Sequence, residues 1–513
     1  MDMKLPRDIK TALGTLPTGS EAYDCAYREA MNRVNRQGPM SVKFAKRVLS
    51  WITCAKRPLT TSELRYALTV REVDEPELED NLPQVEDIVS VCAGLVTVDA
   101  ESDIIRLVHY TTQEYFNRTK RQWFPTVESD IATTCVRYLS FSSFESGYCE
   151  TQKEFQERLQ LNPLYEYAAI YWAYHACVTS LDEEEEQRSI LHFLNSEAKV
   201  SASYQALVSK TLLSFSSTTS SRITGVHLAV SFELEKLITL VLKNTQSPDA
   251  RDSDGQTPLF YASQRGQETV VKALLEKSAD PNLQDAKCRT ALHYAVERGH
   301  EAVVKLLLEN SADPNLKDAK GQTALLYAVE RGHEAVVKLL LENSADPNLK
   351  DETSRAPLIY AARRGYEMIV KLLLKAGAKP NTNDDGNRPP LMYAAAKGHE
   401  AAAKQLLLAR AVVNCKDKLG ATPLHWAAWG QHEAVISLLL KSAADVNISD
   451  KSYSTPLAWA IEREFETGIE MLLKNGSGVN YWYRLDLVRY KERTLAELDI
   501  LKASVHELPE ATK

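Results

Sequence analysis

The chain lacks the signatures of several common functional classes. Its eight cysteines include no CxxC spacing, so neither a zinc site nor a disulfide framework is expected. No apolar run is long enough to span a bilayer, and the start MDMKLPRDIK lacks the apolar core of a signal peptide. None of the twenty glycines lies in a GxxxxGK phrase followed by Ser or Thr. We therefore expect a protein of the cytoplasm or nucleus, not bound to membranes, with no cofactor, no metal and no ATP hydrolysis.

A large excess of basic residues is also missing. The net charge is −8, which favours solubility and gives no whole-chain reason to expect nucleic acid. Apolar residues make up 44% and charged residues 25%, the balance of a globular protein. A length of 513 residues predicts two to four domains.

The second half of the chain contains an internal repeat. The segment ERGHEAVVKLLLENSADPNLKD occurs at 297–318 and again, letter for letter, at 330–351. One position, which we call the cap residue, recurs every thirty-three residues. The cap residues are Thr224, Thr257, Thr290, Thr323, Ala356, Pro389, Thr422 and Thr455.

Each part of this unit has a physical reason. A Thr side chain can cap a helix, and a Pro at the first helical position loses no hydrogen bond. A Gly nine residues later suits a left-handed helix end, and the VVKLLL-type run that follows predicts a second, amphipathic helix. Two units lack the capping Thr, at Ala356 and Pro389, and in the unit of Thr422 the Gly comes one place early, at Gly430. We expect a displaced helix end there.

These features resemble the ankyrin repeat, in period, TPLH phrase, Gly and LL pair. The resemblance covers 224–480 and implies eight units stacked as a solenoid. It also implies that partners are held by the hairpin tips and by the two residues before the Gly.

The first half shows no repeat and predicts a winged-helix-like domain. The expected order is three helices, a hairpin around 99–103 and a closing helix. Thr60 and Glu63 predict a capping box, and Thr111 with Glu114 can cap the closing helix. A DNA-reading third helix needs basic or amide side chains, but 84–94 offers only Gln84, together with Glu86 and Asp87, and no cation. We expect this helix to pack against protein, and we do not expect DNA binding.

The amino-acid sequence of this half resembles the region between the NACHT module and the ankyrin array in fungal NACHT-ankyrin proteins of the NOD-like, STAND class. AKRVLSWITCAKRPLTTSELRYAL and IIRLVHYTTQEYF carry the resemblance, which covers about residues 8–180. It implies a regulatory spacer, and the chain begins where the NACHT module would end.

The expected fold is mostly α, an ankyrin-repeat solenoid preceded by a winged-helix-like domain and a helical segment. The predicted layout is an N-terminal helical segment at 1–40, a winged-helix-like domain at 41–124, a helical spacer at 125–200, a Ser-rich linker at 201–223, eight repeats at 224–480 and a helical tail at 481–513.

No set of residues predicts catalysis. His109 and His175 lie in apolar text that is typical of core histidines, and the remaining conspicuous histidines recur once per unit, which favours a structural role. We therefore expect that the protein is not an enzyme. An enzyme concealed in 41–200 is the alternative that turnover by that half would support.

Charge along the inferred binding positions predicts a partner surface. The hairpin-tip and helix-end positions carry fourteen basic and six acidic side chains, although Glu297 and Glu330 can neutralise their neighbours. Among the aromatic residues nearby, Trp429 is the best anchor, whereas Trp426 and Trp459 are more typical of packing. The candidate partner-binding residues are Arg265, Arg298, Arg331, Arg364, Lys397, Lys287, Lys320, Arg363, Trp429 and Arg463.

The sequence thus predicts a scaffold or adaptor that binds a protein partner with an acidic strip in the concave, basic face of the array. The alternative is a regulatory fragment of a fungal NOD-like receptor that associates with a full-length NACHT protein. The sequence identifies neither the partner, nor the pathway, nor the oligomeric state.

Overall fold

The computed structural model describes residues 20–72, 75, 78–99, 101–177, 184–211, 222–233, 235–243 and 247–478. They divide into two compact units, one ending at Pro258 and the other beginning at Leu259, and each unit is described by itself. The protein is mostly helical, with one two-stranded sheet in the described residues. The predicted helical tail at 481–513 and the first nineteen residues lie outside the described part of the chain.

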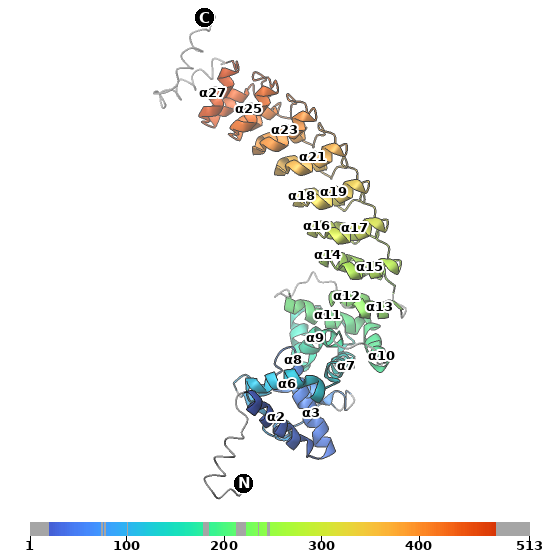
Figure 1. The fold of residues 1–513 in the computed structure, drawn as a ribbon. Helices are drawn as coiled ribbons and strands as arrows, with labels where there is room; N and C mark the ends of the chain where they lie inside the picture. Colours follow the sequence, from blue (N-terminus) through green and yellow to red (C-terminus); the bar gives the residue numbers. More distant parts are fainter. Residues whose placement is uncertain are drawn as a thin grey trace, which may run out of the picture. The chain divides into compact units, whose positions relative to one another are not determined.

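The first unit opens with a winged-helix arrangement (Figure 1). Strands β1 and β2 pair antiparallel, with Val96 opposite Leu107, and Thr60 adds an isolated bridge to Ile104. The elements are α2 (Ser20–Asn35), α3 (Pro39–Cys54), α4 (Thr61–Thr69), α5 (Val85–Val91), β1 (Val96–Asp99), β2 (Ile104–Leu107) and α6 (Tyr110–Trp123).

Local capping explains where these elements begin, and it corrects one prediction. The capping box of Thr60 and Glu63 is present at the start of α4, as predicted. The expected cap of α6 by Thr111 and Glu114 is wrong, because the helix starts two residues earlier and His109 Nδ1 accepts the Thr111 N–H at 3.3 Å. The third helix ends at Val91, earlier than predicted, because the chain turns left-handed at the residues that follow.

A layer of helices completes most of the first unit. Helix α7 packs against α9 and α10, and α9 packs against α11. Their core is aromatic: Trp172 is fully buried and meets the edges of Phe193 and Phe232 at 5.7 and 5.6 Å. The elements are α7 (Val127–Leu139), η2 (Ser142–Phe144), α8 (Gln152–Leu161), α9 (Tyr165–Ala176), α10 (Glu184–Leu194) and α11 (Glu197–Thr211).

Two findings concern this layer. Residues 201–211, which the sequence assigned to a Ser-rich linker, instead continue α11, because Ala202 and Ala206 are buried and small Ser side chains allow close packing. No helix in the described ranges combines the length and the apolar character needed to cross a membrane.

One helix pair follows in the first unit, and seven follow in the second. The first pair is α12 (Gly225–Ser231) and α13 (Glu235–Lys243). The other pairs are α14 (Pro258–Arg265) and α15 (Glu268–Glu276), α16 (Ala291–Arg298) and α17 (Glu301–Glu309), α18 (Ala324–Arg331) and α19 (Glu334–Glu342), α20 (Pro357–Arg364) and α21 (Glu367–Lys375), α22 (Pro390–Lys397) and α23 (Glu400–Leu408), α24 (Pro423–Trp429) and α25 (Glu433–Lys441), and α26 (Pro456–Glu462) and α27 (Glu466–Lys474).

Within the second unit, first helices pack against first helices and second helices pack against second helices. From α16 onward each first helix contacts the first helix of the next pair, and from α15 onward each second helix contacts the next second helix. The pairs follow one another in a curved row, with α14, α16 and α18 on its concave side (Figure 1). Each second helix buries three apolar residues of its stripe, for example Val303, Val304 and Leu307 of α17. A single pair could not bury this surface alone, so the stack stabilises its members.

The left-handed residue that follows each first helix keeps its position even where the sequence changes. The ninth residue after the cap is left-handed in all eight units, whether it is Gly299 (φ 76°), Gln431 (φ 59°) or Glu464 (φ 54°). In the unit of Thr422 the helix ends one residue early, as predicted, but Gly430 (φ −79°) does not take the left-handed conformation. As predicted, the units of Ala356 and Pro389 have no side-chain cap.

Asparagine side chains tie neighbouring loops together. Asn315 Nδ2 donates to Ser344 O at 3.1 Å, and its Oδ1 accepts the Asp346 N–H at 2.8 Å. The same two bonds start from Asn282, Asn348 and Asn447. These bonds fix the spacing between units in loops that bury little apolar surface.

Candidate interaction surface

A buried or half-buried carboxylate in each hairpin of the second unit orients the first helix. Asp318 is 8% exposed, accepts the N–H groups of Lys320 and Gln322, and accepts the Tyr327 hydroxyl at 2.8 Å. The equivalent ring donors in the last two units are indoles, Trp426 to Asp417 at 3.0 Å and Trp459 to Asp450 at 3.1 Å. Trp426 and Trp459 therefore have a packing role, as predicted.

Histidines connect consecutive units. Nδ1 of His293 accepts from the Thr290 N–H at 3.1 Å, and its Nε2–H donates to Gln322 O in the next unit at 3.2 Å. Burial lowers the pKa of His293, against the bond to Gln322, and it also lowers the pKa of His425. A second set, after the left-handed residue, bonds back to the preceding unit, as His399 does to Arg363 O at 3.1 Å. These histidines therefore hold neighbouring units together.

One buried histidine of the first unit lies outside the repeats. His175 is fully buried, with Nδ1–H donating to Glu128 and Nε2 accepting the Tyr167 hydroxyl at 2.9 Å. Burial lowers the pKa of His175 despite its contact with Glu128. Burial opposes ionisation of Glu128, but bonds from His175 and Lys120 hold the pKa of that carboxyl at about 2. Since no substrate reaches a fully buried ring, this chain of groups holds α7 to α9, and the prediction of a satisfied core histidine is confirmed for His175. The same prediction is wrong for His109, which is exposed because its ring caps the start of α6.

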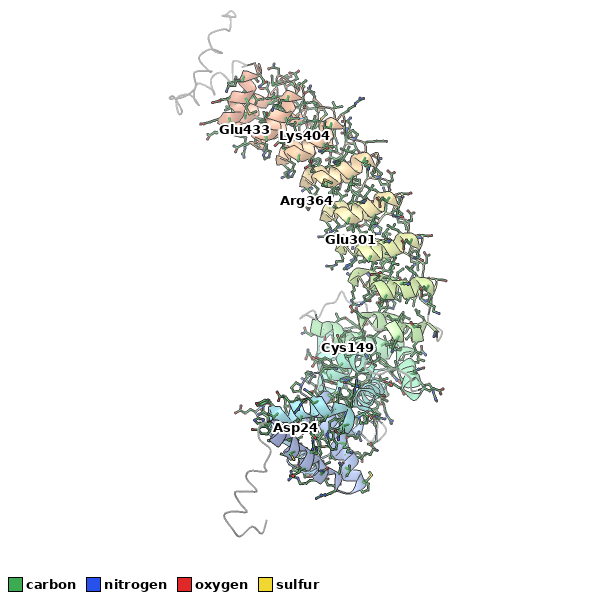
Figure 2. All side chains as sticks on the ribbon, in the orientation of Figure 1. Asp24, Cys149, Glu301, Arg364, Lys404 and Glu433 are labelled. Atoms are coloured by element: carbon green, nitrogen blue, oxygen red, sulfur yellow. The ribbon has the colours of Figure 1, made fainter. Side chains whose placement is uncertain are left out.

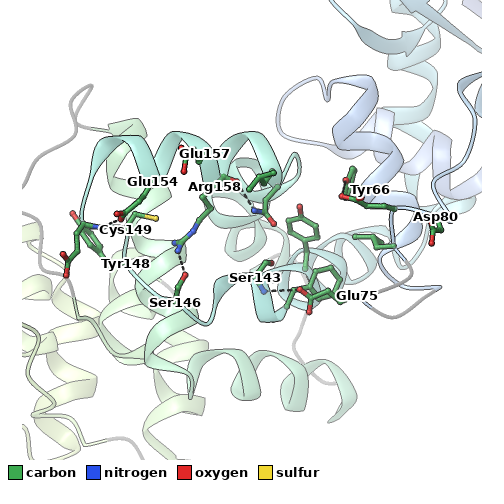
Figure 3. A pocket seen from close by; sticks show the side chains of 17 residues that line it. Tyr66, Glu75, Asp80, Ser143, Ser146, Tyr148, Cys149, Glu154, Glu157 and Arg158 are labelled. Carbon is green, nitrogen blue, oxygen red and sulfur yellow. Dashed lines mark hydrogen bonds between the residues drawn. The ribbon is translucent and has the colours of Figure 1, made fainter.

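A cavity of about 860 Å³ opens in the first unit, between α4, α8 and the loop after α7 (Figure 3). Its polar groups are engaged in holding that loop: Glu75 accepts from the Ser143 N–H at 3.1 Å, and Arg158 donates to Ser146 Oγ at 2.7 Å. These lining side chains therefore stabilise the loop that forms part of the cavity wall. No group of three or more His, Cys, Asp or Glu side chains in the described residues is arranged to hold a metal ion.

The predicted partner-binding residues fall into two groups in the second unit. Eight lie at the last turn of the first helices or just beyond it: Arg265, Arg298, Arg331, Arg363, Arg364, Lys397, Trp429 and Arg463. Lys287 and Lys320 lie in the hairpins that precede the first helices, at the other end of those helices. All nine cations are exposed, and Trp429 is 38% exposed. Figure 2 shows Arg364 on the concave side of the row of pairs.

Positions are now counted from the cap residue of each unit, which is position zero. The position-8 row is Arg265, Arg298, Arg331, Arg364, Lys397 and Arg463.

In two places along the array, position 8 of one unit lies against position 7 of the unit before it. Arg331 pairs with Glu297 at 2.7 Å, and the Arg463 guanidinium lies 4.7 Å from the centre of the Trp429 ring. The same geometry thus produces an ion pair in one place and a cation–π contact in another.

Neutralisation of the row is partial. Glu297 pairs with Arg331 and also with Arg289 at 3.1 Å, as the sequence suggested. Within the described residues, Glu330 forms no ion pair, and neither do Arg298, Arg364 and Lys397. Most of the row therefore keeps its charge exposed.

Sequence reasoning missed two exposed apolar side chains near the end of the array. Leu419 is 58% exposed and Tyr453 is 82% exposed, both in the hairpins of the last two units. The signal was present, because these hairpin places hold Lys320 or Gly321 in an earlier unit. Whether any of these residues binds a partner stays a prediction.

Comparisons with known proteins agree with this architecture. A model of ankyrin repeats (three copies) matches at 201–285, 226–318, 292–384 and 391–482, which together make up more than half of the chain. The chain belongs to the ankyrin-repeat family. A second model, the winged helix domain of GPI inositol-deacylase, matches residues 33–138. The position of that match agrees with the winged-helix arrangement of α3 to α6.

Two further comparisons complete the picture. No curated protein matches the chain. Among solved structures, the human ASB11 ankyrin repeat domain is similar, with 28% sequence identity and a TM-score of 0.39 over 44% of this chain and 99% of that one.

Proposed function

We propose that this ankyrin array is a protein-interaction scaffold that binds an acidic segment of a partner along the position-8 row. The observation that carries the proposal is the recurrence of an exposed cation at the same place in successive units, at Arg298, Arg331 and Arg364, with the aromatic Trp429 near one end. Repetition at a fixed interval suits an extended partner, and cations steer an acidic one toward the surface. The role proposed is binding and not catalysis.

The test compares two triple charge reversals in the same three units. The row variant carries Arg298→Glu, Arg331→Glu and Arg364→Glu. The control variant carries Lys305→Glu, Lys338→Glu and Lys371→Glu, which change the net charge equally but lie on the second helices α17, α19 and α21. Circular dichroism should show that all the proteins keep their helical content.

Affinity capture from the native cell and binding of a labelled Glu-rich peptide provide the readouts. We expect the row variant to lose both, and the control to keep both. Binding to the wild type should weaken with salt, because exposed charges are screened over about 8 Å at physiological ionic strength. Equal capture by all three proteins would remove the row from the proposal.

A second candidate function is favoured by the winged-helix match at 33–138. In this version the chain regulates a full-length NACHT protein by association through its first unit. The row variant separates the two functions, because it should still co-purify with a NACHT protein under the second and should lose its partner under the first.

A further inference from the structure

The position-8 row is not uniform, and its local differences suggest what kind of segment it holds. The contact of position 8 with position 7 of the preceding unit, seen in Arg331 with Glu297 and in Arg463 with Trp429, gives the register for the whole row. Along the row toward the C-terminus, the side chains at the paired positions change from an ion pair, to basic residues, to small residues, to an aromatic residue.

The cationic part is the cluster of Arg363, Arg364 and Lys397. Position 7 is Glu in the two preceding units, but here it is Arg363, which the register places beside Lys397. All three side chains are exposed, and none forms an ion pair within the described residues, although Glu330 occupies the place that faces Arg364. Adjacent like charges repel one another. An anion bound among them relieves this repulsion and accepts several charge-assisted hydrogen bonds.

The backbone beneath this cluster is fixed while its charged ends are free. The carbonyl of Arg363 accepts from His399 Nε2 at 3.1 Å, and Gly365 closes the helix in a left-handed conformation. The guanidinium groups therefore project from a rigid turn, which limits the conformational entropy lost on binding.

The next step of the row has almost no side chain. The register pairs Ala396 with Gly430, and a Cβ built on Gly430 would lie 3.1 Å from Ala396 O and closer still to the His432 ring. The array's own atoms therefore fill the space beside Gly430, and this step of the row offers a partner neither a charged nor an aromatic side chain.

The following step is aromatic. Trp429 is 38% exposed, stacks edge-on against Trp459 at 5.7 Å and is covered on one side by Arg463. Unlike Trp426 and Trp459, it does not donate to a hairpin carboxylate. A half-exposed indole held between two neighbours is a rigid surface for an apolar side chain.

We propose that the partner segment is bipartite: a multiply charged anionic group at Arg363, Arg364 and Lys397, a small linker over Ala396 and Gly430, and an apolar side chain on Trp429. This inference rests on the proposed function of the row. Packed helices lie about 8–10 Å apart, so the two subsites are separated by roughly 10–20 Å, which about three to six extended residues span. The anionic group is a phosphorylated residue or a pair of carboxylates, since both offer several oxygens to the guanidinium groups.

Synthetic peptides test this ordering. The probes are labelled fourteen-residue peptides in which two Asp, or one phosphoserine, are followed by Gly-Ser-Gly-Ser and then Trp-Leu. A reversed peptide places Trp-Leu first, and an anion-only peptide replaces Trp-Leu with Ser-Ser. Affinity is measured by fluorescence polarisation with the full chain.

We expect one of the two bipartite orders to bind about tenfold or more tightly than the anion-only peptide. Trp429→Ala should remove that difference while leaving anion-only binding within about twofold. Arg363→Glu should abolish binding of every acidic peptide, and the matched reversal Lys371→Glu, on the second helix of the same unit, should change none. A tenfold preference for phosphoserine assigns the cluster to a phosphorylated residue, equal affinity assigns it to carboxylates, and both results support the site.

Two outcomes separate the failure of this inference from the failure of the proposed function. If the anion-only peptide binds as tightly as both bipartite peptides, and Trp429→Ala has no effect, the bipartite ordering is overturned while the row remains. If no acidic peptide binds and the triple reversal in the row leaves capture intact, the proposed function itself is overturned.

Discussion

Acidic pH should lower the stability of the first ankyrin unit by protonating one buried histidine. His227 is fully buried; its Nδ1 accepts the Thr224 N–H at 3.3 Å, and its Nε2–H donates to Gln256 O at 3.1 Å. Only the neutral ring can make both bonds. Burial lowers the pKa of His227 to about 4, with the bond to Gln256 opposing the shift.

The sign and size of the effect follow from this pKa. The unfolded chain takes up the proton near pH 6.5 and the folded chain only near pH 4, so the stabilisation is complete above about pH 7 and falls away as the pH drops to 4. Between pH 7.5 and pH 5 the loss is about 2 kcal/mol, because the unfolded histidine is almost fully charged at pH 5 and the folded one is not.

The chain itself supplies the substitution for the test. The unit of Thr323 has Leu326 in the same place, and Thr323 Oγ1 still accepts the Leu326 N–H at 3.4 Å. His227→Leu should therefore fold, should be less stable than the wild type by about 1–2 kcal/mol at pH 7.5 through lost hydrogen bonds, and should lose stability less steeply toward pH 5.

Hydrogen exchange of peptides from 225–243 measures this difference as protection factors at pH 7.5 and 5.0. The matched control is His192→Gln, at an exposed position of α10. If protection in wild type and His227→Leu fell in parallel toward pH 5, the titration of His227 could not be the cause.

Three other predictions concern stability and are checked by urea unfolding followed by circular dichroism. Arg410 has φ 64° where an earlier unit has Gly377, so Arg410→Gly should stabilise and Gly377→Ala, which meets open space, should destabilise, each by about 1 kcal/mol; unchanged midpoints would contradict this. Asn348→Ala removes bonds to Gly377 O and from the Lys379 N–H, and should lower stability by about 1–2 kcal/mol, which a wild-type midpoint would disprove. Trp172→Ala should lower the stability of the first unit by about 3–5 kcal/mol, and a loss below 1 kcal/mol would argue against its place in the core.

Much of the fold could be predicted because its rules are local. Each unit is specified by interactions within one or two turns of chain: a Thr at the cap, a Pro at the first helical position and an apolar stripe at helical spacing. Its two helices could therefore be predicted from the sequence. The capping box of Thr60 and Glu63 was predictable for the same reason. Of the linker predicted at 201–223, the part at 201–211 was wrong because a serine-rich sequence is compatible with either a linker or a helix, and only the burial of Ala202 and Ala206 decides that it is a helix.

Sequence alone determined the repeat, its thirty-three-residue step, the two helices of each unit and the cations at position 8, because each follows from residues close together in the chain. Tertiary structure decided what those residues meet. Gln431 and not Gly430 is left-handed because His432 is held on both sides, its N–H to Ala427 O and its ring to Ala396 O. Likewise, only stacking determines that Arg331 meets Glu297 and Arg463 meets Trp429, since contacts between units depend on how whole modules align and not on any single one of them.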